Sequence, residues 1–207
     1  MTTATLGTER QQLYKASARE PKFVRVPEIG FVMIDGHGDP NTSAEYADAI
    51  QGLYSLSYTL KFALKKELGL LYRVAPLEGL WWADNIAEFS QERKGDWRWT
   101  MMIAQPEDVT PERFEGGRGD AGRKKDLPAL PNTRLERFEE GPAAQILYIG
   151  PYSDEGPTIA RLHAFIREHG YSFEGSRQKQ HEIYLSDPRR SAPERWRTII
   201  RQPFTEA

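Results

Sequence analysis

The chain has 207 residues and no cysteine, and its 28 basic and 30 acidic side chains give a formal net charge of −2. This length allows one large domain or two small ones, with a core that needs no disulfides. The lack of cysteine excludes a thiolate nucleophile and a cysteine-ligated zinc site. The balanced charge argues against a nucleic-acid binder, which would usually carry a basic excess.

The N-terminal residues 1–16 contain no apolar segment typical of signal peptides, and no stretch of the chain approaches membrane-spanning length. We therefore expect a soluble cytoplasmic protein with no membrane partner. The four histidines show no metal-ligand spacing, so we expect neither a metal nor a cofactor. The sequence does not indicate an oligomeric state.

Residues 20–106 are predicted to form strands on either side of one long helix. The helix, "TSAEYADAIQGLYSLSYTLKFALKKELG", follows the strand "FVMID", begins with a capping box of Thr42 and Glu45, and ends near Gly69. Its leucines form one apolar stripe, and a second stripe at a spacing of four residues contains Tyr54, Tyr58 and Phe62. The strands "YRVA", "GLWWA" and "WRWTMMIA" follow the helix.

Residues 107–132 are rich in glycine, proline and charge, which is typical of a linker or long loop. We expect the basic cluster between Arg113 and Lys125 to be a solvated part of this loop.

Residues 133–204 are predicted to repeat the pattern of the first half. A shorter helix, "EGPTIARLHAFIREHG", has Pro157 near its start and Gly170 after its end, with strands on both sides. "GLWWAD" can be laid over "EIYLSD", and "DWRWTMMIAQP" resembles "ERWRTIIRQPF". We therefore predict a single α+β domain over residues 1–207, made of two pseudo-symmetric strand-helix-strand-strand units with antiparallel sheets. A central ligand cleft is expected between the units, because small-molecule sites favour such interfaces.

This overlay assigns the matched strand residues to two faces, because successive strand residues point to opposite sides. One face is apolar and is expected to be core: Leu80, Trp82, Ile183 and Leu185. The other face combines aromatic rings, the space over a glycine and a carboxylate: Gly79, Trp81, Glu182 and Tyr184. We expect Trp82 to pack and Trp81 to line a cavity. The alternative is that Trp81 is partly buried core and that Glu182 is solvated.

Five segments in order resemble the GyrI-like small-molecule-binding family: "FVMIDGHGDPN", "LYSLSYTLKF", "YRVAPLEGLWW", "YIGPY" and "HEIYLSDPRR". The resemblance covers about residues 10–204 and implies a pair of strand-helix-strand-strand units around a cleft. Relatives serve as effector-binding domains of drug-responsive transcription regulators, as gyrase inhibitors and as free-standing binding proteins. A glutamate on a late strand is characteristic of the binders, and Glu182 matches it.

A free-standing subfamily with the "PLEGLWW" type of sequence resembles this chain best. Some of its members look like hydrolases that open the cyclopropane of DNA-alkylating natural products inside an aromatic cage. The resemblance implies an aromatic or cationic xenobiotic as ligand, with hydrolysis as a detoxifying activity. The alternatives are a drug-sequestering or effector-binding module without chemistry, and a protein-interaction role like that of a gyrase inhibitor.

Glu182 is the first candidate for chemistry, because burial among aromatic rings raises a carboxyl pKa and suits either a counter-ion or a base. Aromatic walls also attract cations and flat rings. A tyrosine hydroxyl could donate to an oxygen that gains charge, and the candidates are Tyr148, Tyr152 and Tyr184. The residues expected to bind ligand are Trp81, Gly79, Tyr184, Tyr54, Tyr58, Phe62 and Trp99. Glu78 is expected to have a surface role.

Overall fold

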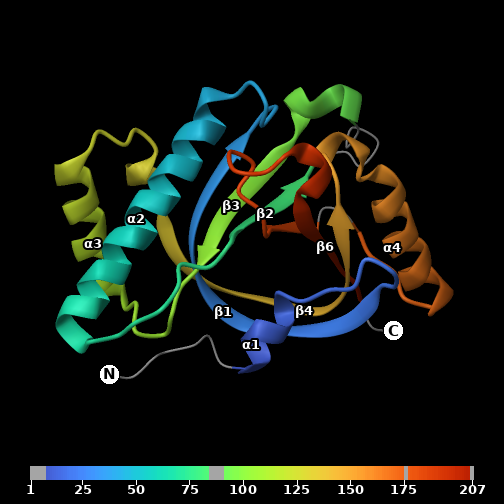
Figure 1. The fold of residues 1–207 in the computed structure, drawn as a ribbon, viewed down its shortest axis with the longest axis horizontal. Helices are drawn as coiled ribbons and strands as arrows, with labels where there is room; N and C mark the ends of the chain where they lie inside the picture. The colour runs from blue at the N-terminus through green and yellow to red at the C-terminus, as the bar shows by residue number, and fades with distance from the viewer. Residues whose placement is uncertain (1–7, 84–90, 175–176, 206–207) are drawn as a thin grey trace.

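The structure is a computed structural model that describes residues 8–83, 91–174 and 177–205. In this part of the chain, six antiparallel strands form one sheet that closes into a barrel in the order β1-β3-β2-β5-β6-β4 (Figure 1). The strands are β1 (Lys22–His37), β2 (Leu77–Trp82), β3 (Arg98–Ala104), β4 (Arg134–Ile149), β5 (Gln180–Tyr184) and β6 (Arg197–Pro203). The helices are α1 (Thr8–Leu13), α2 (Ala44–Leu68), α3 (Pro111–Lys124) and α4 (Gly156–Glu168).

The element order confirms the predicted α+β repeat. The first half runs β1-α2-β2-β3 and the second runs β4-α4-β5-β6. The halves join where β1 pairs with β4 and where β2 pairs with β5. In the second pairing Gly79 lies directly opposite Glu182, the residue onto which the sequence overlay places it. The pseudo-twofold axis therefore passes between Gly79 and Glu182.

The residues around this axis share one face of the sheet, because directly opposed residues in antiparallel strands point to the same side. A row of direct partners crosses the strands in the order Ile34, Met101, Gly79, Glu182, Ile200 and Ile146. α2 covers one end of this face and α4 covers the other (Figure 1). The middle of the face, on β2 and β5, therefore lies between the two helices.

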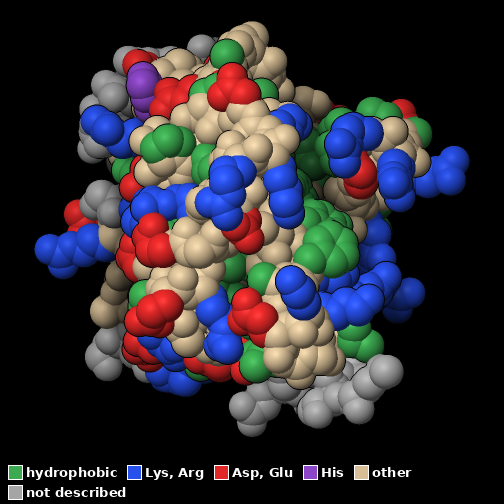
Figure 2. Space-filling view, turned by 90° about the vertical axis from the view of Figure 1, so that its left-hand side faces the viewer, with side chains coloured by type: hydrophobic (Ala, Val, Ile, Leu, Met, Phe, Trp, Pro, Cys, Tyr) green, Lys and Arg blue, Asp and Glu red, His purple; other side chains and the backbone are tan. Residues whose placement is uncertain are grey.

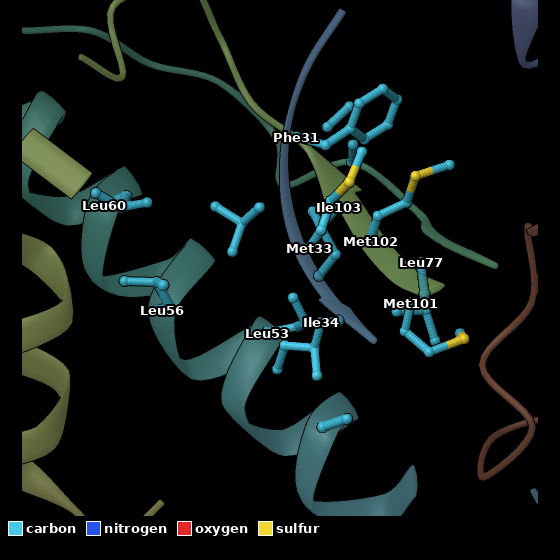
Figure 3. Packing of buried hydrophobic residues seen from close by; sticks show 14 of the residues in the cluster. Phe31, Met33, Ile34, Leu53, Leu56, Leu60, Leu77, Met101, Met102 and Ile103 are labelled. Atoms are coloured by element: carbon cyan, nitrogen blue, oxygen red, sulfur yellow. The ribbon is translucent and has the colours of Figure 1, made fainter. Parts of the chain in front are cut away.

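α2 is a capped helix whose leucines form much of the core. Its N-cap is Ser43, whose hydroxyl accepts from the Tyr46 amide at 3.3 Å, so the expected cap at Thr42 is wrong by one residue. The helix ends at Gly69, where a φ of 66° suits glycine. Leu53, Leu56 and Leu60 are fully buried: Leu53 lies beside Ile34 of the sheet, and Leu56 and Leu60 lie on the side of the helix that faces α3 (Figure 3). None of the helices in the described ranges is both long and apolar enough to cross a membrane.

The prediction of a loop throughout residues 107–132 is wrong, because α3 occupies Pro111–Lys124. Its N-cap is Thr110, and Phe114, Gly117 and Ala121 form its buried face. The glycines that lower its helix propensity include Gly117, where an added Cβ would lie only 2.6 Å from Leu60 Cδ2 of α2. This glycine lets α3 lie close against α2. Acidic and basic side chains alternate over this side of the molecule (Figure 2).

Two short 3-10 helices also border the face between α2 and α4. η2 (Gln91–Asp96) precedes β3, and η4 (Tyr152–Asp154) precedes α4. The described residues also include η3 (Leu130–Asn132) and η5 (Pro193–Arg195). Leu162 and Ile166 of α4 pack against Ile146 and Ile200 of the sheet, as the apolar face of that helix predicts.

Candidate functional site

Glu182 of β5 is the centre of the site. Its side chain is only 6% exposed, and its carboxylate accepts hydrogen bonds from the Tyr184 hydroxyl at 2.9 Å and from Gln180 Nε2 at 2.7 Å. Burial raises the pKa of Glu182, although the two donated hydrogen bonds act in the opposite direction. The group is therefore a stronger base than a solvated glutamate, and it has two fixed donors that hold its orientation.

Trp81 and Tyr184 form a chain of hydrogen bonds that leads to this carboxylate. Trp81 Nε1 donates to the Tyr184 hydroxyl at 3.0 Å, and that hydroxyl donates in turn to Glu182. The space expected over Gly79 is filled by the Trp81 indole, since a Cβ at Gly79 would lie 2.8 Å from Nε1. The glycine therefore makes room for the tryptophan and not for a ligand.

Further aromatic rings lie around Trp81 and Tyr184, the two residues that lead to Glu182. Tyr46, from the first turn of α2, lies 5.9 Å from Trp81 between ring centroids, and Trp97 lies 5.7 Å from Trp81 on another side. Tyr152 of η4 lies 5.6 Å from Tyr184 and 4.8 Å from Trp196, which is in the loop before β6. We call these seven residues the aromatic–carboxyl cluster: Tyr46, Trp81, Trp97, Tyr152, Glu182, Tyr184 and Trp196. Such rings present π faces that attract cations and flat ligands.

Glu155 is a second carboxyl at the site, and the sequence analysis missed it. It occupies the N-cap position of α4 but does not cap that helix with its side chain. It lies instead within hydrogen-bonding reach of Glu182 and is 4% exposed, and its buried Oε2 makes no hydrogen bond to any described residue. Burial and the neighbouring Glu182 raise the pKa of Glu155 to about 9. The sequence signal was its place just before α4. The corresponding helix of the first half, α2, also brings a residue from its start, Tyr46, to the site.

The three candidate tyrosines differ in the hydrogen bonds that their hydroxyl groups donate. Tyr184 already donates to Glu182, and Tyr148 donates to the Pro151 carbonyl at 2.9 Å while packing with the α4 cluster. Tyr152 is half-buried in the site, and its hydroxyl donates no hydrogen bond within the described residues. Burial and the charge of Glu182 raise the pKa of Tyr152 to about 12, so this hydroxyl keeps its proton at neutral pH.

The other predicted ligand-binding residues lie at increasing distance from the carboxyl group. Tyr54 is half-buried beside Leu77 and Asp187 at the edge of the site. Tyr58 stacks on Tyr54 at 6.5 Å and is 46% exposed, and Phe62 is 61% exposed one turn further along α2. These two are surface residues because the stripe to which they belong turns away from the sheet.

Trp99, also predicted to bind ligand, is a core residue. It is fully buried, its indole lies over Gly36, it is the direct strand partner of Trp81, and its ring lies 5.3 Å from that of Tyr46 between centroids. Trp99 therefore packs behind both Tyr46 and Trp81.

The predicted burial of the two adjacent tryptophans, with Trp82 in the core and Trp81 lining a cavity, is wrong. Trp81 is 4% exposed and belongs to the main core cluster, whereas Trp82 is half-buried with Lys179 Nζ 3.5 Å from its ring centroid. The prediction of which residues share a face is correct, because Trp81 lies on the same side of the sheet as Gly79 and Glu182. The indole nevertheless packs inward and contributes its N–H to the site.

We expect Trp81→Phe to lower the free energy of unfolding by about 2 kcal/mol, since it leaves a gap over Gly79 and removes the donor to Tyr184. Trp82→Phe keeps an apolar ring under Lys179 and should cost less than about 1 kcal/mol. Urea unfolding of both variants measures this difference. A larger loss at Trp82 would contradict the packing described above.

A buried ionic network lies directly behind Glu182, on the opposite face of β5. His181 contacts Glu140 through Nδ1 and Glu78 through Nε2, both at 2.9 Å, and Arg201 donates to Glu140 at 3.0 Å. Despite burial, Glu140 and Glu78 raise the pKa of His181 to about 9. His181 and Arg201 lower the pKa of Glu140 to about 2. Glu78, 2% exposed and bonded to the Tyr14 hydroxyl at 2.7 Å, therefore has no surface role.

The fold and this site together define a small-molecule-binding domain, and comparison with known proteins agrees. The model of the GyrI-like small molecule binding domain matches residues 19–204, so the chain belongs to the GyrI-like family. No curated protein matches the chain significantly.

Solved structures of other proteins are similar to this chain over nearly its whole length. An uncharacterized conserved protein from Listeria innocua has 38% sequence identity and a TM-score of 0.87, covering 95% of this chain and 97% of its own. A hydrolase from Listeria innocua has 36% identity and a TM-score of 0.82, covering 95% and 98%. The C-terminal domain of EcmrR, with 11% identity, a TM-score of 0.54 and coverage of 91% and 98%, shares the fold alone.

Proposed function

We propose that this protein binds aromatic or cationic xenobiotics at the aromatic–carboxyl cluster and hydrolyses those that carry an activated cyclopropane, so that DNA-alkylating compounds are detoxified. The observation that carries the proposal is Glu182, a buried carboxylate held by two donors and surrounded by aromatic rings. A similar protein of 36% identity is named a hydrolase, which supports an activity of this class.

The proposed reaction uses Glu182 as a base. Its carboxylate takes a proton from a water molecule, and the water oxygen attacks a methylene carbon of the cyclopropane. The carbon–carbon bond to the ring junction breaks, and its electron pair moves into the conjugated carbonyl, which becomes an oxyanion. The raised pKa of Glu182 favours the proton transfer at neutral pH. Enclosure between rings also holds a flat substrate in one orientation.

Tyr152 is assigned as the donor to the oxyanion. Its hydroxyl donates to no described residue, whereas those of Tyr148 and Tyr184 already donate to Pro151 and Glu182. A donor aimed at the developing charge stabilises the transition state more than the substrate.

The test is to incubate the protein with a simple spiro-cyclopropyl dienone and to measure the water adduct by mass spectrometry. We expect Tyr152→Phe to lower turnover roughly 10²-fold, the usual cost of one lost oxyanion donor. Tyr148→Phe is the matched control and should keep the wild-type rate, because this hydroxyl points to Pro151. Equal losses in both variants would contradict the assignment of Tyr152, and the absence of any adduct would overturn the hydrolase.

A second candidate function is binding without chemistry. It is favoured by the lack of any salt bridge between Glu182 and a basic side chain within the described residues, which leaves a cation as a suitable partner for the cluster. Quenching of tryptophan fluorescence by ligands, without formation of a water adduct, would support this candidate over the hydrolase.

A further inference from the structure

Two carboxyl groups from separate elements meet at the site. Glu182 comes from β5 and Glu155 from the start of α4, and both are more than nine-tenths buried. Their side chains lie within hydrogen-bonding reach of each other. Two carboxylates this close in a buried site cannot both carry a charge at low cost, so the pair retains one proton.

The surrounding hydrogen bonds decide which carboxyl holds the proton. Gln180 and Tyr184 donate to Glu182 and so stabilise its ionised form. Within the described parts of the chain, the buried Oε2 of Glu155 has no hydrogen-bond partner, and its pKa of about 9 agrees with a neutral acid at pH 7. We therefore assign the shared proton to Glu155 and the negative charge to Glu182.

The neighbouring charges do not neutralise a second carboxylate. Lys94 of η2 lowers the pKa of Glu155, but less than burial and Glu182 raise it. On the back of β5, His181 is already paired with Glu78 and Glu140.

Further ionisable groups near the pair are seen among the described residues. At the edge of the site, Asp187 is paired with Arg189 at 2.9 Å. The phenols that face the pair have raised pKa values and stay neutral: Tyr46, Tyr152 and Tyr184. Among the described residues, no basic group offsets a second negative charge at the pair, so that compensation has to come from a bound cation.

We propose that Glu155 and Glu182 form a proton-exchanging pair that selects organic cations: the bound cation takes the place of the shared proton, which is released to solvent. The inference rests on the proposed function only in taking the aromatic–carboxyl cluster as the ligand site. It adds a role for Glu155 and names the chemical class of the ligand. This ligand is a permanent or fully protonated cation with an aromatic group. A neutral ligand would leave the proton on Glu155.

The exchange makes cation affinity depend on pH. At pH values below the pKa of the pair, release of one proton per cation raises the affinity up to tenfold for each pH unit. We expect this dependence for a quaternary ammonium ion, whose own charge does not titrate. The affinity for a neutral aromatic ligand should stay constant over the same range.

The experiment is isothermal titration calorimetry with benzyltrimethylammonium and with the neutral probe N-benzylacetamide. Titrations at pH 7.5 in three buffers of different ionisation enthalpy give the number of protons released. For the wild type we expect close to one proton per cation and none per neutral probe, with nearly tenfold tighter cation binding at pH 7.5 than at pH 6.5. Glu155→Gln should release none and should bind the cation equally at both pH values.

Glu139→Gln is the matched control, because it removes an exposed carboxyl of β4 away from the pair and should behave as the wild type. Cation binding by the wild type without proton release would overturn the exchange while leaving the proposed ligand site intact. Proton release that persists in Glu155→Gln would also overturn it. Binding of neither probe would overturn this inference together with the proposed binding function.

Discussion

Glu182→Gln should lower the turnover of a neutral cyclopropane substrate by roughly 10²–10⁴-fold, the usual contribution of a general base, while substrate binding remains intact. The amide keeps the shape of the side chain and can still accept from Tyr184, so the aromatic cluster should stay in place. The measurement is the rate of water-adduct formation at saturating substrate, with binding followed separately by tryptophan fluorescence.

The neighbouring carboxyl makes this variant more informative. The charge of Glu182 is one cause of the raised pKa of Glu155, so Glu155 should ionise more readily in Glu182→Gln. Residual turnover that rises with pH would identify Glu155 as a substitute base. The double variant with Glu155→Gln should then remove this residual activity. A rate for Glu182→Gln within a few-fold of the wild type would contradict the base role.

Ligand charge separates the base role from a counter-ion role. If Glu182 serves only as a counter-ion, its change to Gln should weaken the binding of cations and leave neutral ligands unaffected. If neither binding nor turnover changes, the site assigned around Glu182 is wrong. One variant, tested with one neutral and one cationic ligand, therefore distinguishes all three cases.

Arg201→Met should lower the free energy of unfolding by about 3–5 kcal/mol, because it removes one partner of a buried ion pair and leaves the other charge uncompensated. Arg201 is 2% exposed and contacts Glu140, Gln145 and the Leu13 carbonyl. Without it, two buried glutamates would share the single positive charge of His181. Urea unfolding at pH 7 measures the loss.

Arg197→Met is the control, since Arg197 begins the same strand but is exposed, and its change should stay within about 0.5 kcal/mol. The Leu13 carbonyl also loses its donor in Arg201→Met, so the segment around α1 should become easier to cleave with a protease. Similar stabilities for the two variants would show that the network contributes little to folding.

The sequence overlay predicted the sheet face of the site because strand alternation and an internal repeat are both visible in a single chain. Laying Glu182 over Gly79 placed these residues with Trp81 and Tyr184, and the observed pairing of β2 with β5 agrees. The same reasoning could not predict burial. The barrel closes and α1 covers its other side, so Glu78 and His181 are interior as well, although alternation suggested a solvated face for Glu78.

Other features depend on contacts that a local pattern does not contain. α3 was predicted as loop because its glycines disfavour a helix, yet Gly117 is needed for its close packing on Leu60. Glu155 was missed because it lies in a turn with no periodicity, and its significance comes from Glu182, which is 27 residues later in the chain. Trp99 was misassigned because its aromatic character is the same in a core as in a ligand site.

The position of the pseudo-twofold axis between Gly79 and Glu182 has a consequence for the origin of the site. In a dimer of identical half-units, the two residues at the axis would have to be the same. Two glycines would provide no base, and two glutamates would meet face to face with like charge and displace the Trp81 indole from its place over Gly79. Joining the halves in one chain removes this restriction, so that one half supplies the reactive group and the other supplies the room to enclose it.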